Sequence, residues 1–124
     1  MAGEQILVVE DNEKNMKLVR DVLQATGYST LEATSGEEAV EVARSHGPAL
    51  VLMDVQLPGA DGVETLARLR DDERTATTPV IALTAQAMHG DRERFLAAGF
   101  DAYLSKPVDI LELVAAVQEL CARG

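Results

Sequence analysis

The stretch LVLMDVQLPGADG, residues 50–62, contains the pattern that determines the fold class. Four apolar residues at positions 50–53 run directly into Asp54, and a turn at Pro58-Gly59 follows. Aspartate is depleted in strands and is rarely buried without a partner, so this acid indicates that the strand ends at a polar rim. A strand that is apolar throughout is typical of a parallel sheet covered by helices on both faces.

Short apolar runs of the same kind recur along the chain, at residues 6–9, 28–31, 80–83 and, more weakly, 102–104. Segments with helical periodicity separate them, such as the one that carries Val63, Leu66, Leu69 and Arg70. Five repeats of strand and helix with right-handed crossovers predict an α/β fold with a doubly wound five-stranded parallel sheet flanked by five helices. We expect residues 1–124 to form a single domain.

Composition narrows the class of protein. The chain has 124 residues, and 11 Lys and Arg against 21 Asp and Glu give a net charge of -10, which argues against direct binding of nucleic acid. No apolar run is long enough to span a bilayer, and the N-terminal segment lacks the basic region of a signal peptide. We therefore expect no membrane insertion and a cytoplasmic location.

The last predicted helix begins after Asp109, a predicted N-cap, and carries the single cysteine. One cysteine cannot form an internal disulfide and suits a reducing compartment. It falls on the apolar stripe of Ile110, Leu113, Val117 and Cys121. We expect Cys121 to be a small buried residue rather than a reactive thiol.

Polar residues follow four of the five predicted strands. Ligands of a doubly wound sheet bind outside the carboxyl ends of the strands, so these residues are expected to meet at one rim. The second strand, which ends near Ala33, is expected at an edge of the sheet and away from the site. The four strands that meet end in Glu10-Asp11, Asp54, Thr84 and Lys106.

Three carboxylates at one rim repel each other unless a cation lies between them. Oxygen ligands of this kind suit Mg²⁺, with Asp11 and Asp54 as direct ligands and Glu10 bound directly or through water. The backbone carbonyl of Gln56 is a candidate for a further ligand.

Lys106 and Thr84 add an ammonium and a hydroxyl around Asp54, a combination that suits a phosphoryl group. Asp54 is then the best candidate nucleophile, since carboxylates are known covalent acceptors. Considered alone, each residue also has a purely structural interpretation. Asp11 could be the N-cap of the first helix, and the Thr84 hydroxyl could form a local hydrogen bond at the strand end.

Four motifs occur in a recognisable order: ILVVEDN (6–12), LVLMDVQLPGADG (50–62), PVIALTA (79–85) and GFDAYLSKP (99–107). With them the chain resembles the receiver domain of two-component response regulators over essentially its full length. The resemblance implies a flavodoxin-like strand order 2-1-3-4-5, which chemotaxis receivers share. It also implies a phosphorylation-dependent switch of a two-component phosphorelay, a phosphoacceptor rather than a turnover enzyme.

The resemblance assigns a role to each residue of the rim. It implies that Asp54 takes a phosphoryl group from a sensor histidine kinase or a histidine phosphotransfer protein. The other implied roles are Mg²⁺ ligation by Glu10, Asp11 and the Gln56 carbonyl, a switch hydroxyl at Thr84, phosphoryl pairing by Lys106, an aromatic switch at Tyr103, and a cis bond between Lys106 and Pro107.

The segments NEKNMKLV (12–19) and AMHGDRERF (87–95) are most similar to single-domain regulators of the DivK type. Such a regulator acts on a downstream regulatory protein, here expected to bind the fourth helix, fifth strand and fifth helix. The start of the first helix, near Asn12 and Asn15, is the expected docking face for the kinase. Met88, His89 and Arg92 are candidates for the partner surface or, equally, for core and solvated positions.

Other interpretations stay open from the sequence alone. The chain also fits a receiver excised from a hybrid histidine kinase or a multidomain regulator. A phosphatase with an aspartate nucleophile usually has a second acid two residues later, where this chain has Gln56. A flavodoxin-like FMN protein needs a phosphate-binding loop where this chain has Glu10-Asp11, and usually aromatic residues, of which it has few and no Trp.

Overall fold

The computed structural model describes residues 3–55, 62–84, 91–106 and 108–123. Their strands form one parallel sheet in the order β2-β1-β3-β4-β5, which confirms the predicted class and order and places β2 at an edge. The strands are β1 (Gln5–Val9), β2 (Ser29–Ala33), β3 (Leu50–Asp54), β4 (Val80–Thr84) and β5 (Ala102–Ser105).

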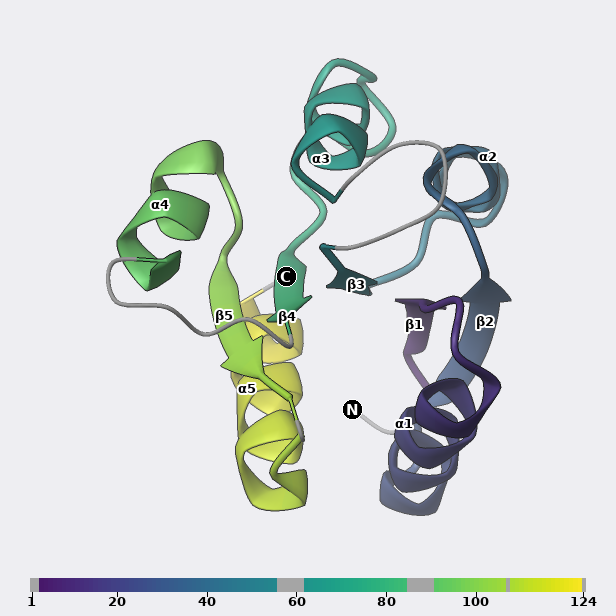
Figure 1. Ribbon diagram of the computed structural model, residues 1–124. Coiled ribbons are helices and arrows are strands. Elements are labelled where there is room, and N and C mark those ends of the chain that lie inside the picture. Colours follow the sequence, from purple (N-terminus) through teal and green to yellow (C-terminus); the bar gives the residue numbers. More distant parts are fainter. Residues whose placement is uncertain (1–2, 56–61, 85–90, 107, 124) are drawn as a thin grey trace.

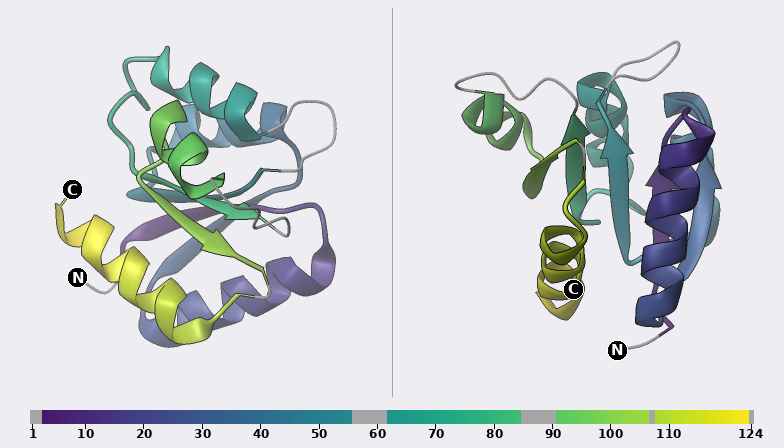
Figure 2. Two further views of the ribbon diagram at one scale, coloured as in Figure 1. Left: turned by 60° about the vertical axis from the view of Figure 1, so that its left-hand side comes forward. Right: turned by 60° about the horizontal axis from the view of Figure 1, so that its bottom comes forward.

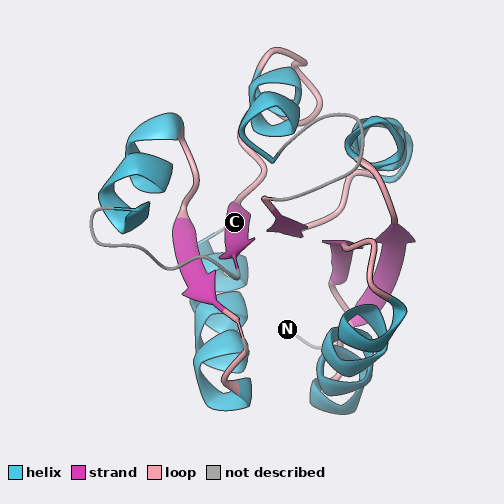
Figure 3. Ribbon diagram, in the orientation of Figure 1, coloured by secondary structure: helices cyan, strands magenta, loops and turns pink. Residues whose placement is uncertain are grey.

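A helix follows each strand along the chain (Figure 3). Helices α1 and α5 cover one face of the sheet, and α2, α3 and α4 cover the other (Figures 1 and 2). This two-sided cover explains why β3 and β4 are buried over their whole length. The helices are α1 (Glu13–Thr26), α2 (Gly36–His46), α3 (Gly62–Arg70), α4 (Asp91–Ala98) and α5 (Ile110–Arg123).

Local sequence sets where three helices begin. The Asn12 side chain accepts hydrogen bonds from the backbone N–H groups of Lys14 and Asn15, so Asn12, not Asp11, caps α1. Ser35 caps α2 in the same way. Asp109 caps α5 through the N–H groups of residues 111 and 112, which confirms its prediction as an N-cap.

The core has two parts, one on each face of the sheet. Alternate residues of β1, β3 and β4 pack under α1 and α5 in one part, and the residues between them pack under α2, α3 and α4 in the other. The buried strand residues of both parts continue to the strand ends, so these ends form a rim that is supported by the core.

Two positions on the predicted apolar stripes are on the surface, because each lies in the first turn of its helix. Val63 in α3 is 41% exposed and Ile110 in α5 is 48% exposed. Cys121, further along α5, is buried as predicted, and burial raises the pKa of its thiol to about 11. No helix among the described residues is long and apolar enough to cross a membrane.

Candidate active site

The register of the sheet brings the predicted rim residues together. Val9 pairs with Met53, so Glu10 leaves β1 beside Asp54 at the end of β3. Asp54 pairs with Leu83, the residue before Thr84. Since β3 lies at the centre of the sheet, Asp54 has side chains from both neighbouring strands around it.

Lys106 joins two of the acids. Its Nζ donates to Asp54 Oδ2 and to Glu10 Oε2, each at 2.7 Å, across sequence separations of 52 and 96 residues. Both carboxylates are buried, with Glu10 2% and Asp54 5% exposed. The lysine side chain is 15% exposed. One buried ammonium is therefore shared by two buried carboxylates.

Backbone bonds hold these charged groups in place. Glu10 Oε1 accepts from the Asn12 N–H at 3.2 Å, and the Glu10 N–H donates to Ala33 O at 3.0 Å. The Lys106 N–H donates to Thr84 O at 2.7 Å, which fixes the lysine to the end of β4. Glu10 and Lys106 thus approach Asp54 from opposite sides on backbone that the sheet itself positions.

The electrostatic environment acts on Glu10 and on Lys106 in different ways. Burial raises the pKa of Glu10 above its ordinary value. The hydrogen bond from Lys106 opposes this rise without cancelling it, and the negative charge of Asp54 adds to it. Burial by itself lowers the pKa of Lys106, but hydrogen bonds and charges from Asp54 and Glu10 outweigh it and raise the pKa. The Lys106 ammonium therefore stays charged, while burial makes the negative charge of Glu10 costly unless further positive charge lies nearby.

Asp11 completes an acidic cluster. One carboxylate oxygen from each of Glu10, Asp11 and Asp54 lies within 4.8 Å of the others, and Asp11 is exposed where the other two are buried. Hard oxygen ligands on a partly open site fit Mg²⁺, which keeps several waters when it binds to one or two carboxylates. The donor set therefore fits the predicted ion.

Thr84 and Tyr103 share one face of the sheet. Tyr103 pairs with Ala82, and Thr84 lies two residues after Ala82 along β4. Thr84 is 2% exposed, and Tyr103 is half-buried. The structure therefore brings the predicted hydroxyl to the rim and puts the predicted aromatic residue behind it. The predictions of the Gln56 carbonyl ligand, of the cis bond before Pro107, and of Met88 and His89 as partner-surface candidates lie outside the described residues.

The positional role of Gly62 was not predicted from the sequence. A Cβ at this position would lie 2.6 Å from the Val55 Cα and 3.2 Å from Asp54 O, and the Gly62 N–H donates to Val55 O at 2.9 Å. The first turn of α3 thus packs directly against the backbone that carries Asp54. The signal in the sequence was a glycine, not a residue with a side chain, at the start of a predicted helix.

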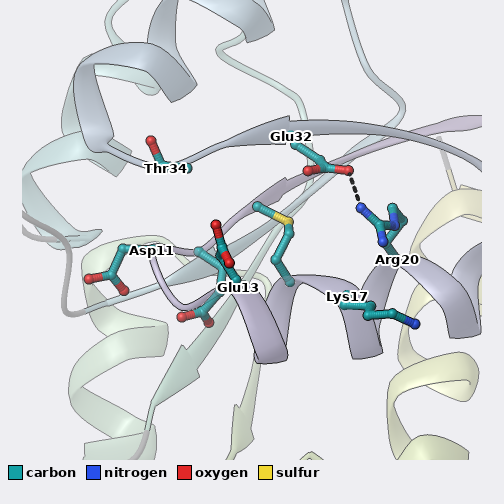
Figure 4. A pocket seen from close by; sticks show the side chains of 8 residues that line it. Asp11, Glu13, Lys17, Arg20, Glu32 and Thr34 are labelled. Carbon is teal, nitrogen blue, oxygen red and sulfur yellow. Dashed lines mark hydrogen bonds and ion pairs between the residues drawn. The ribbon is translucent and has the colours of Figure 1, made fainter.

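A recess of about 340 Å³ lies beside the acidic cluster, between α1 and β2 (Figure 4). Glu10 and Asp11 belong to its lining, so it adjoins the cluster directly. Lys17 and Arg20 of α1 line its other end, where Arg20 Nη1 pairs with Glu32 Oε2 at 3.1 Å. The α1 side of the site is therefore a hollow surface lined by charges of both signs.

The comparisons with known proteins agree with this geometry. The sequence profile of the response regulator receiver domain matches residues 6–118. The chain therefore belongs to the receiver domain family of two-component signalling. Its function is that of a phosphorylation-dependent signalling switch, and proteins of this kind act with histidine kinases and downstream effectors.

Among curated relatives, the polar-differentiation response regulator DivK of Brucella ovis is 48% identical over 113 residues, which is 91% of this chain and 92% of that protein. DivK of Brucella anthropi is 46% identical with the same coverage. The predicted resemblance to DivK-type regulators is confirmed.

Solved structures show the same fold. A response regulator from Chloroflexus aurantiacus superposes with a TM-score of 0.91 and 34% identity, covering 97% of this chain and 98% of that one. The receiver domain of the sensor histidine kinase PA1611 from Pseudomonas aeruginosa superposes with a TM-score of 0.90 and 38% sequence identity. The match covers 98% of this chain and 99% of that one. That second structure has a magnesium ion coordinated in its active-site cleft.

Proposed function

We propose that Asp54 is the phosphoacceptor of this receiver and that Glu10, Asp11, Thr84 and Lys106 assist it. The observation that carries the proposal is the sharing of one Lys106 ammonium by two buried carboxylates, with a third acid beside them. A structural ion pair needs only one acid for one base. The surplus of negative charge next to a rigidly held carboxylate suits a site that takes up a cation and then a phosphoryl group.

Mg²⁺ is the cation that the donor set favours, held by Asp11 and Asp54 with Glu10 directly or through water. When bound, it neutralises charge on the phosphoryl oxygens. The magnesium in the related kinase receiver supports this assignment. The Gln56 carbonyl remains part of the proposal as a further ligand.

The donor is a phosphohistidine of a sensor histidine kinase or a phosphotransfer protein. An Asp54 carboxylate oxygen attacks phosphorus in line, the bond from phosphorus to the histidine nitrogen breaks, and the nitrogen keeps the electron pair. Lys106 holds Asp54 Oδ2 in place and offers its positive charge to the phosphoryl group. Attack of water on the resulting acyl phosphate returns Asp54 to its carboxylate form.

The chain then acts as a switch and not as a turnover enzyme. A phosphatase with an aspartate nucleophile needs a general acid near position 56, and this chain has glutamine there. Its only catalysis is its own phosphorylation and dephosphorylation. We also propose that residues 1–124 form one receiver domain.

Thr84 and Tyr103 transmit the effect of phosphorylation to the surface of the domain. We propose that Thr84 moves to the phosphoryl oxygen, that Tyr103 turns inward, and that the α4-β5-α5 surface changes for a downstream regulatory protein. A hollow of about 260 Å³ on this surface supports the proposal, since Leu96, Leu104 and Leu120 lie among its lining residues. Leu96, which is 38% exposed, offers a protein partner an apolar contact in this hollow, whereas Leu104 and Leu120 form its buried floor.

The kinase docks on the start of α1. Leu18 on this helix is 44% exposed, and Glu13, Lys17 and Arg20 of the same helix line the charged recess between α1 and β2. An exposed apolar side chain beside charges of both signs suits a helical partner surface. Phosphotransfer profiling against candidate kinases identifies the partner.

Phosphotransfer to purified protein tests the proposal. A labelled histidine kinase with Mg²⁺ should label wild type with a hydroxylamine-sensitive acyl phosphate, and Asp54→Asn should reduce labelling to background. Asp71→Asn is the matched control, because it removes an exposed carboxylate directly after α3. Labelling of Asp54→Asn at the wild-type level would show that the nucleophile is another residue.

A further inference from the structure

Three of the four aromatic residues of the chain meet between α4 and β5. The rings of Phe95 and Tyr103 are stacked, with centroids 5.7 Å apart and an interplanar angle of 21°. Phe100 meets Phe95 edge-on, at 5.9 Å and 89°. The Arg94 guanidinium lies 4.8 Å from the Phe95 centroid. Phe95 is therefore the central ring of the cluster.

Phe95 and Tyr103 differ in how firmly they are held. Phe95 is 4% exposed and Phe100 is 3% exposed, so both are fixed in the core under α4. Tyr103 is only half-buried and lies on β5, an edge strand. Of the three rings, Tyr103 is the one that can leave the cluster without opening the core.

The position of Tyr103 connects this cluster to the rim. On the face that carries Phe95, its neighbour across β4 is Ala82, whose side chain is small, and Thr84 follows on the same face. Tyr103 thus packs against Phe95 of α4 and shares its face of the sheet with Thr84. A turn of the ring that carries it away from Phe95 breaks the stack.

We propose that Phe95 is a positioning residue that sets the resting balance of the switch by holding Tyr103 in its stacked position. This inference rests on the proposed function, because it assumes that Tyr103 turns inward when the site is occupied. Stacking stabilises the resting state, and its loss on activation releases α4 from β5. The position of helix α4 therefore depends on the position of the Tyr103 ring.

Fluorine NMR of protein labelled with 3-fluorotyrosine tests this directly. The chain has two tyrosines, Tyr28 and Tyr103, so the spectrum has two protein signals, and Tyr103→Phe assigns them. Beryllofluoride with Mg²⁺ serves as the phosphoryl analogue, and its own bound signal reports occupancy of the site. Phe95→Leu removes the stacked ring, and Phe95→Met provides a second variant if the first does not fold.

In both Phe95 variants the Tyr103 signal should move toward its activated position before beryllofluoride is added. The half-saturating beryllofluoride concentration should fall about two- to tenfold, because the binding-competent fraction rises when an aromatic pair is lost. Phe100→Leu is the matched control, since it removes a ring from the same cluster that meets Phe95 and not Tyr103 in a ring contact. It should leave both values as in wild type.

Two results would overturn the inference. The first is that the Phe95 variants keep the Tyr103 signal and the half-saturating beryllofluoride concentration of wild type. The second is that Phe100→Leu shifts the signal and the concentration as much as the Phe95 variants do. The second result would mean that general packing, not the stack, controls Tyr103. A wild-type protein that gives no bound beryllofluoride signal would instead contradict the proposed function, and the inference with it.

Discussion

Charged networks lie at both ends of the sheet, and they differ in charge balance. At the carboxyl ends of the strands, Lys106 is shared by Glu10 and Asp54, with Asp11 beside them. At the opposite end, Arg70 pairs with Asp101, and its other N–H groups donate to the carbonyls of residues 76, 78 and 99. One network has more acids than bases, and the other is balanced.

The balanced network is a clamp between chain segments. Arg70 ends α3, and its partners lie on the connections before β4 and before β5. Asp101 Oδ2 also accepts from the Val80 N–H at 2.8 Å. Every partner is a carbonyl or the one carboxylate, so the guanidinium needs no ligand from outside. A network with one acid for one base stabilises the fold, whereas a network with more acids than bases also suits the binding of a cation.

The largest expected effect comes from Lys106→Met. The variant leaves two buried carboxylates without their cation, so phosphotransfer should fall by about a hundredfold and the free energy of unfolding by about 3 kcal/mol. Kinase labelling and urea unfolding measure the two losses. Arg68→Met is the control, since it removes an exposed positive charge on α3 outside the site and outside the proposed docking surface, and it should change neither value.

Thermal unfolding with and without Mg²⁺ tests the role of Lys106 further. The ion should raise the Tm of Lys106→Met more than that of wild type, because it then supplies the positive charge that the acids lack. Equal stabilisation of the two proteins would contradict the idea that Lys106 is the internal counterion of the cluster.

Arg70→Met should break the clamp without touching the site. The loss of charged hydrogen bonds to the backbone and Asp101 should lower the free energy of unfolding by about 2–3 kcal/mol in urea titrations, with phosphotransfer at the wild-type rate. Arg44→Met removes a more exposed ion pair with Asp72 and should cost less. A folded Arg70→Met protein with impaired phosphotransfer would erase the distinction between the two networks.

Gly62→Ala tests how rigidly the fold holds Asp54. The new methyl group would meet the Val55 backbone, and relief of this clash should cost about 2 kcal/mol of unfolding free energy and slow phosphotransfer. Gly47→Ala has open space around it and a φ of +58°, so it should show only a backbone penalty and normal phosphotransfer. Equal phosphotransfer rates in the two variants would argue against a positional role for Gly62.

The smallest effect is expected from Asp11→Ala. This acid is exposed and lies outside the hydrogen bonds of Lys106, so its removal should leave stability unchanged. Mg²⁺ affinity, followed by calorimetric titration, should weaken by about tenfold with the loss of one direct ligand. Unchanged affinity would remove Asp11 from the metal site, and Glu13→Ala serves as the control for a neighbouring exposed acid.

The sequence by itself determined the class of fold and predicted which residues meet at the candidate site. Apolar runs that end in Glu10, Asp54 and Thr84 could be recognised because periodicity and strand ends are local features of a chain. The parallel sheet then follows from short connections and right-handed crossovers, which bring the strand ends to one rim. The motifs of the receiver family added the roles of these residues.

Only the tertiary structure decided how the charges are shared. The bridge from Lys106 to Glu10 and Asp54, the contact of Gly62 with the backbone after Asp54, and the stack of Phe95 on Tyr103 depend on distances between elements. Arg70 has an ordinary place in a helical pattern, yet it joins three segments of the chain. Register and side-chain packing set such distances, and neither is encoded by residues that are near each other in the sequence.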